Sequence, residues 1–250
     1  MNEQELCQKR LIDLSKQANR KGIVLFSGFL NLNELNIYHQ SKRFFETETE
    51  AFGGVPCAER QMIAFIPDAL YYEWEYPIAA LRIVPVYPKF AEKFGHRDVL
   101  GAIMKLGVDR SKIGDILIGD DASYLLLEEE MASYFKEQLD RIRQTVVRLE
   151  DAALAGIEIQ QELTEREGIV TSNRLDSVVA CVHRLSRSQA LELFRREKVF
   201  VNGKLMQNST YACHPGDIVS VRGFGRFVYQ FESGETNKGR IKFQYGLYGN

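Results

Sequence analysis

Apolar positions in the first part of the chain follow a helical spacing. Between Leu6 and Ala18 they recur as on one face of a helix, which predicts an N-terminal helix. A second helical segment is expected over residues 32–44. The run Phe52-Gly53-Gly54-Val55-Pro56 then interrupts the pattern with glycines and a proline, which is typical of a loop. These features predict a helical region over residues 1–55.

The pattern changes over residues 56–160, where short apolar runs alternate with amphipathic stretches. Apolar runs bounded by turn residues predict strands, and amphipathic stretches predict helices. The turn Gly119-Asp120-Asp121 is expected to join two of the strands. This region is predicted to be an α+β domain with its helices on one face of a sheet. The expected order is strand, strand, helix, strand, strand, helix, strand, at residues 62–66, 79–86, 98–106, 115–118, 123–127, 128–142 and 145–149.

Residues 170–250 carry signals for a small α+β domain with two short helices. Asn173 is expected to cap the first helix. Ser186 and Gln189 form the Ser-x-x-Gln pattern of a capping box, which predicts the start of the second helix. Asn202-Gly203 predicts a tight hairpin turn with positive φ. Further strands are expected at residues 163–170, 227–231 and 240–245.

Composition is that of an ordinary globular protein, with 45% hydrophobic and 26% charged residues. The charge is distributed unevenly, however. Residues 174–250 contain 12 Lys+Arg and 6 Asp+Glu, which gives +6, and the net charge of -2 for the whole chain leaves -8 for residues 1–173. A change of sign along one chain indicates separate domains and a polyanionic partner for the basic one.

The basic module, residues 174–223, offers cationic and hydrogen-bonding side chains to an RNA backbone. Free N–H groups at the start of its second helix can bind phosphate, and the forked guanidinium group of arginine matches phosphate oxygens. A solvated charged surface has the same spacing, so both interpretations stay open here. The candidate RNA-binding residues are Arg174, Arg184, Ser186, Arg187, Ser188, Gln189, Arg195, Lys198, Asn202 and Lys204.

Four blocks of the basic module resemble the small RNA-binding domain named after ribosomal protein S-four. The resemblance implies binding to structured RNA, as in ribosomal proteins, pseudouridine synthases and bacterial tyrosyl-tRNA synthetases. Glu197 departs from the pattern, because many members have glycine before the first strand. The blocks are Arg174-Leu175-Asp176, Ser186-Arg187-Ser188-Gln189-Ala190, Val199-Phe200-Val201-Asn202-Gly203-Lys204 and Gly216-Asp217-Ile218-Val219-Ser220-Val221-Arg222-Gly223.

The whole chain resembles the YlmH family of bacterial proteins. The resemblance is carried by Phe52-Gly53-Gly54, Ala58-Glu59-Arg60 and Gly114-Asp115-Ile116, with the basic module last. It implies a middle domain of the ferredoxin-like or RNA-recognition type over residues 56–160 and an RNA-binding domain over residues 170–250. It also implies binding to the rRNA of the large ribosomal subunit and to tRNA, quality control of stalled translation, and a gene setting near cell-division genes.

Motifs for catalysis, cofactors and metals are missing from the sequence. The 4 histidines form no His-Glu-x-x-His pair, and the 4 cysteines form no Cys-x-x-Cys pair. We therefore expect no catalytic residue, no cofactor, no metal and no small-molecule substrate. No apolar stretch approaches the roughly 20 residues that span a bilayer, so no membrane partner is expected. Sparse, unpaired cysteines indicate a cytoplasmic protein.

Three functions are compatible with the sequence, and a non-catalytic RNA-binding protein acting on the ribosome is the one we expect. An RNA-modifying enzyme of the pseudouridine synthase type would use the basic module for targeting; however, Asp176 of the Arg-Leu-Asp block is expected to be a helix-start residue. An adaptor would bind a protein through the acidic N-terminal part. The aromatic run at residues 71–76 offers rings on which bases can stack, but Glu73 and Glu75 oppose the approach of phosphates, so packing in the core or at a sheet edge is expected.

Overall fold

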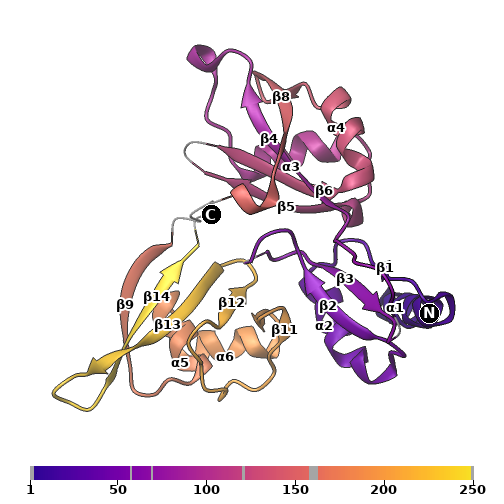
Figure 1. The fold of residues 1–250 in the computed structure, drawn as a ribbon. Helices are drawn as coiled ribbons and strands as arrows, with labels where there is room; N and C mark the ends of the chain where they lie inside the picture. The colour runs from indigo at the N-terminus through magenta and orange to yellow at the C-terminus, as the bar shows by residue number, and fades with distance from the viewer. Residues whose placement is uncertain (1–2, 57, 69, 120–121, 158–162, 249–250) are drawn as a thin grey trace. The chain divides into compact units, whose positions relative to one another are not determined.

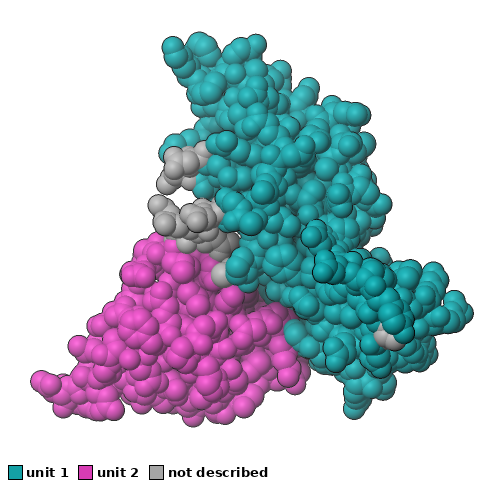
Figure 2. Space-filling view, in the orientation of Figure 1, with its two compact units in different colours: residues 1–159 teal, residues 160–250 magenta. Residues whose placement is uncertain are grey.

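A computed structural model describes residues 3–56, 58–68, 70–119, 122–157 and 163–248 of the chain. The chain divides into two compact units, residues 1–159 and residues 160–250, which Figure 2 shows in teal and magenta. In each unit, helices pack against antiparallel sheets. This mixture confirms the expected α+β class.

The first part of unit 1 is a three-stranded antiparallel sheet with two helices on one face (Figure 1). Leu11, Leu35 and Tyr38 of the helices pack on Ile63 and Phe65 of the central strand, because alternate residues of a strand share a face. The strand order is β1-β3-β2. The elements are α1 (Glu3–Lys21), β1 (Leu25–Phe26), α2 (Leu32–Ser41), η1 (Lys42–Phe44), β2 (Glu48–Phe52) and β3 (Met62–Ile66).

Two expectations for this part are corrected. The N-terminal region is not purely helical, since it contains β1 and β2. Strand β3 belongs to this sheet and not to the middle one, because Met62 pairs with Phe52 of β2. Gly53 lies in the loop that returns the chain from β2 to β3, where an added Cβ would lie 2.3 Å from the Cβ of Ala58. The Gly53-Gly54 motif therefore marks a turn inside the first sheet.

The rest of unit 1 is a five-stranded antiparallel sheet with strand order β5-β6-β4-β8-β7. Val99 and Ile103 of α3 and Phe135 of α4 pack on one face, against Leu81 and Leu125 of the central strands. Without the short β7, the order of elements is βαββαβ, as in ferredoxin-like folds. The elements are β4 (Ile78–Pro85), η2 (Pro88–Phe90), α3 (His96–Met104), η3 (Arg110–Lys112), β5 (Ile113–Ile118), β6 (Ser123–Glu128), η4 (Glu129–Met131), α4 (Ala132–Gln138), β7 (Arg141–Ile142), β8 (Thr145–Ala152) and η5 (Leu154–Gly156).

The predicted helix over residues 128–142 is too long at both ends. Its first residues form η4, and Arg141 and Ile142 pair with β8 as strand β7. The expected turn at Gly119-Asp120-Asp121 falls partly on residues 120–121, which lie outside the described residues. The strands on either side of it, β5 and β6, do pair antiparallel.

Unit 2 is a six-stranded antiparallel sheet with two helices on one face (Figure 1). Val179 of α5 and Phe194 of α6 pack with Phe227 and Phe243 of the long C-terminal hairpin. The strand order is β11-β10-β12-β13-β14-β9, so β14 lies between β13 and β9. The elements are β9 (Thr164–Val170), α5 (Leu175–Val182), α6 (Arg187–Arg195), β10 (Val199–Val201), β11 (Lys204–Leu205), β12 (Ile218–Val221), β13 (Gly225–Glu235) and β14 (Ile241–Leu247).

Candidate nucleic-acid interface

Asp176, in the first turn of α5, organises the start of the basic module. Its side chain has no exposed surface. The Nε and Nη2 atoms of Arg174 donate hydrogen bonds to its two carboxylate oxygens over 3.1 and 3.0 Å, and the N–H of Ser177 donates to Oδ1 over 3.0 Å. A buried carboxylate is costly unless it is hydrogen-bonded and paired with a positive charge. These bonds therefore fix the orientation of Arg174.

Arg187, the first residue of α6, reaches the same carboxylate. Its Nη2 atom lies 3.7 Å from Oδ2 of Asp176, while 70% of its side chain is exposed. The side chain of Arg174 is 37% exposed. The buried carboxylate of Asp176 thus holds two guanidinium groups beside each other, and the three side chains together carry a net charge of +1. Because Nε and Nη2 of Arg174 already donate to Asp176, the exposed guanidinium of Arg187 is the forked donor of the pair that suits a phosphate group, and Arg174 adds positive charge beside it.

Of the two predicted helix caps, the one of α6 is present in the structure and the one of α5 is not. Ser186 caps α6 as predicted: its Oγ accepts from the N–H of Gln189 over 3.2 Å, and its own N–H donates to Oε1 of Gln189 over 2.8 Å. The hydroxyl of Ser188 lies 3.0 Å from that of Ser186. The expected cap at Asn173 is wrong, because Arg174 is the N-cap residue of α5. The hydroxyl oxygen of Ser186 and the amide oxygen of Gln189 are thus used as hydrogen-bond acceptors at the start of the helix.

Arg195 lies at the opposite end of α6, about 12 Å from Arg187 along the helix axis. Its side chain is 77% exposed, and its Nη1 atom lies 3.6 Å from a carboxylate oxygen of Glu192. Arg196 donates to the same carboxylate over 2.9 Å. Hydrogen bonding to Arg196, with the charges of both arginines, lowers the pKa of Glu192. Exposed ion pairs of this kind are weak, so Arg195 remains accessible to a ligand.

The remaining candidates lie on turns and strands. Asn202 has a φ of 48° in the predicted hairpin turn; its side chain donates to Asp217 over 3.0 Å and accepts from the N–H of Ile218 over 2.9 Å. Its hydrogen-bonding groups thus stabilise the turn. Arg184, which follows α5, and Lys204, in β11, are exposed. Lys198, which precedes β10, is half-buried.

The structure thus brings Arg174 and Arg187 together and leaves the other cations spread along α6 and the first hairpin. The residue that sequence reasoning missed as a member of the site is Asp176, which was assigned only to the helix start. One signal was available in the sequence. Asp176 belongs to the Arg174-Leu175-Asp176 block and lies between Arg174 and Arg187, the two arginines that converge on it in the structure. Two further arginines cover aromatic rings: Arg222 lies 5.1 Å from the ring centroid of Phe200, and Arg226 lies 4.3 Å from that of Tyr248.

The aromatic run at residues 71–76 is divided between packing and exposure. Trp74 and Tyr76 form a cluster with Phe26 and Phe52, with neighbouring ring centroids 5.2 to 5.8 Å apart. The side chain of Tyr71 is 95% exposed. The expectation of packing is therefore confirmed for the second half of the run.

Over the described ranges, no group of three or more His, Cys, Asp or Glu side chains gathers closely enough to hold a metal ion. In those same parts of the chain, no helix combines the length and the apolar character needed to cross a membrane.

The βαββαβ part of unit 1 belongs to a known class of domain. Residues 73–156, which span β4 to β8, match the model of a family described as "Putative RNA-binding domain in YlmH". A Bacillus subtilis (strain 168) protein, "Ribosome-associated protein quality control protein P2", is 32% identical over 199 residues, which cover 77% of this chain and 76% of the relative. The chain therefore belongs to the YlmH family.

A solved structure supports the fold. The "Cell division protein ylmH from Streptococcus pneumoniae" matches 63% of this chain and 95% of its own length, with a TM-score of 0.50 and 19% sequence identity. At this identity the likeness concerns the fold alone.

Proposed function

We propose that this protein binds RNA on the ribosome without catalysing a reaction, and that unit 2 docks on structured rRNA of the large subunit. The observation that carries the proposal is the pair of Arg174 and Arg187, which Asp176 holds side by side at the surface of the basic module. The charge of +6 over residues 174–250 favours the same polyanionic ligand.

The basic module is proposed to be an RNA-binding domain of the S-four type. In support, its sequence blocks fall on the start of α5, the start of α6, the β10–β11 turn and β12. The phosphate contacts are assigned first to Arg174, Arg187, Arg195 and Lys204. The other proposed contacts are Arg184, Ser186, Ser188, Gln189, Lys198 and Asn202. Because phosphate contacts release counterions, the affinity is expected to fall steeply as salt rises.

The cellular role is proposed from the relatives. The Bacillus subtilis relative is named for ribosome-associated quality control, and we assign this chain to the same process in the cytoplasm. Its ligand would be a large subunit that still holds tRNA after translation has stalled, so tRNA is a second proposed contact. The streptococcal structure is named for cell division, and a link to division is part of the proposal.

The rival function, an RNA-modifying enzyme, is disfavoured by the burial of Asp176. Both of its carboxylate oxygens are hydrogen-bonded, and no part of the side chain is exposed to a substrate. Nucleoside analysis of RNA from cells lacking the protein tests this alternative. A missing modified nucleoside would favour the enzyme, and an unchanged profile is expected.

The central test is sedimentation of the full-length chain with separated ribosomal subunits. The double variant Arg187→Ala, Arg195→Ala should lose retention on large subunits by at least about tenfold, since two phosphate contacts are removed. The matched control is Arg20→Ala, Arg148→Ala, which removes two exposed positive charges from unit 1. Equal retention of both double variants and the unaltered chain would contradict the proposal.

A further inference from the structure

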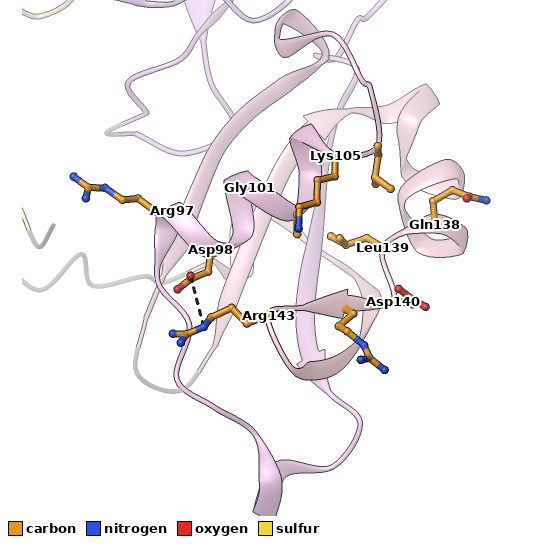
Figure 3. A pocket seen from close by; sticks show the side chains of 11 residues that line it. Arg97, Asp98, Gly101, Lys105, Gln138, Leu139, Asp140 and Arg143 are labelled. Atoms are coloured by element: carbon orange, nitrogen blue, oxygen red, sulfur yellow. Dashed lines mark ion pairs between the residues drawn. The ribbon is translucent and has the colours of Figure 1, made fainter.

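A pocket of about 470 Å³ lies on the helical side of the middle sheet. It is bordered by α3, by the end of α4 and by the β7–β8 turn (Figure 3). Four cations line it, and two acids accompany them, which leaves a net charge of +2. The charged lining residues are Arg97, Asp98, Lys105, Asp140, Arg141 and Arg143.

The acids of the pocket do not neutralise its cations. Asp98 accepts a hydrogen bond from the N–H of Gly95 over 2.9 Å and so serves the start of α3. Among the described residues, Asp98 contacts one lining cation: its Oδ1 atom lies 3.9 Å from Nε of Arg143, as the dashed line in Figure 3 shows. Arg97, Lys105 and Arg141 are exposed and form no ion pair with any described residue. Three cations are thus free of ion pairs among the described residues, and the fourth, Arg143, is 52% exposed, with its Nε atom 3.5 Å from a carboxylate oxygen of Glu92 as well as 3.9 Å from Asp98.

Two backbone features shape the pocket. Gly101 stands inside α3, where glycine is destabilising, yet an added Cβ would meet nothing within 4 Å, so the glycine keeps the helix surface bare. Arg143 has a φ of 53° because it lies in the two-residue turn that joins β7 to β8, and hairpin turns of this length use positive φ. The turn thus holds an arginine at the pocket's edge.

The opposite face of the sheet is partly covered by the chain itself. In RNA-recognition domains that face carries aromatic rings on its central strands, on which bases stack. Here Ala80 of β4 and Leu126 of β6 are buried on that face, with Leu154 and Ile157 packed against them, and its one aromatic residue on β6, Tyr124, is half-buried in the same cluster. Base stacking at the centre of the sheet is therefore blocked, although the family match identifies this domain with RNA binding.

We propose that the α3 pocket is a second RNA-binding site, which takes phosphate groups of the RNA backbone through Arg97, Lys105, Arg141 and Arg143. Three of these residues are arginines, whose forked donors match phosphate oxygens. Arg97 and Lys105 stand at the two ends of α3, about 12 Å apart along its axis. They therefore contact different phosphates, and a strand rather than a single anion is the ligand. The inference rests on the RNA-binding function proposed above.

The test uses the full-length chain with two probes, a fluorescein-labelled oligouridylate and purified large ribosomal subunits. The variant Arg97→Glu, Arg141→Glu should weaken binding of the oligouridylate by about tenfold or more and reduce its salt dependence. Lys9→Glu, Lys16→Glu is the control, because it makes the same change of charge on exposed residues of α1. An equal loss in the control would show a general effect of charge and overturn the proposal.

Gly101→Gln is the second variant, since it fills the open surface of α3 without altering charge. It should weaken oligouridylate binding while the thermal unfolding midpoint stays the same or rises. Unchanged oligouridylate affinity in both pocket variants would overturn the proposal. Unchanged affinity for this probe with lost retention on large subunits would indicate an acidic protein surface as the ligand and would also overturn it.

The same measurements separate this inference from the proposed function. If Arg187→Ala, Arg195→Ala loses binding and the pocket variants do not, RNA binding by the basic module is supported and the proposal of a second site in the α3 pocket is wrong. If only the pocket variants lose binding, the second site stands and the assignment to the basic module fails. If neither set loses binding, both proposals fail.

Discussion

The Nε atom of Arg60 donates a hydrogen bond to the carbonyl oxygen of Ile113 over 2.8 Å, although Arg60 follows the second strand of the first sheet and Ile113 begins a strand of the middle sheet. The Nη2 atom of Arg60 also donates to the carbonyls of Phe29 and Arg110 over 2.8 and 2.9 Å. Burial lowers the pKa of Arg60, although arginine remains charged in proteins. One guanidinium group thus joins the two sheets of unit 1.

Replacement of Arg60 should loosen this junction. Arg60→Lys keeps the charge and loses the fork, so the carbonyl of Phe29 loses its donor, whereas the carbonyls of Ile113 and Arg110 keep Nη1 of Arg110 and the N–H of Ile113. We expect the free energy of unfolding to fall by about 2 to 4 kcal/mol. Urea denaturation measures this change, with exposed Arg148→Lys as the control. An Arg60→Lys midpoint equal to that of the control would show that the junction depends on other contacts.

Two glycines of unit 1 should respond oppositely to alanine. At Gly53 an added Cβ would lie 2.3 Å from the carbonyl oxygen of Arg60, so Gly53→Ala should cost about 1 to 3 kcal/mol through strain. At Gly101 the space is open, and Gly101→Ala should stabilise the helix by up to about 1 kcal/mol. Thermal unfolding of the two variants compares them directly. Shifts of the same sign would contradict the local geometry.

Removal of the Asp176 carboxylate should destabilise unit 2. Asp176→Ala leaves the half-buried guanidinium of Arg174 without its partner, whereas the N–H of Ser177 keeps the carbonyl oxygen of Arg174 as an acceptor. A loss of about 3 kcal/mol is expected. Glu192→Ala, which removes an exposed carboxylate that also pairs with two arginines, should change stability little. Chemical denaturation followed by far-ultraviolet circular dichroism tests the pair, and equal losses would refute the special role given to Asp176.

Stability should also depend on pH through His183, at the end of α5. Burial lowers the pKa of His183 below its ordinary value of about 6.5. The unfolded chain therefore binds a proton at higher pH than the folded chain does. This contribution to stability is fully present above about pH 6.5 and declines as pH falls toward the folded-state pKa.

His183→Phe should remove that dependence. The ring lies against Phe224 and Phe227, and its Nε2 is buried without a hydrogen-bond partner among the described residues, so phenylalanine suits the position. The expected result is a flatter decline of the unfolding free energy below about pH 6.5. Exposed His214→Phe is the control. An unchanged slope for His183→Phe would assign the acid sensitivity to other groups.

Local features of the fold were predictable from the sequence, and long-range pairing was not. Ser186 and Gln189 identified the start of α6 because a capping box depends on residues three apart. Met62 begins a strand as expected, yet its partner Phe52 is set by a loop whose path the periodicity does not show. Helix α4 ends before Arg141 because that residue pairs with Val146, a contact that overrides local helix propensity.

The candidate sites show the same division. The residue types of the basic module indicated a polyanion, but the convergence of Arg174 and Arg187 on one carboxylate depends on how α5 and α6 pack. The α3 pocket could not be predicted, since its lining combines residues 97–106 with residues 138–143. Neither segment carries a recognisable motif by itself.

The interior position of β14 has a consequence for biosynthesis. Residues 241–247 supply Phe243 and Tyr245 to the core and separate β13 from β9. While these residues are still inside the exit tunnel of the translating ribosome, β9 has no neighbour and the arginine-bearing helices rest on an incomplete sheet. A nascent chain should therefore acquire its finished C-terminal unit only after this strand emerges.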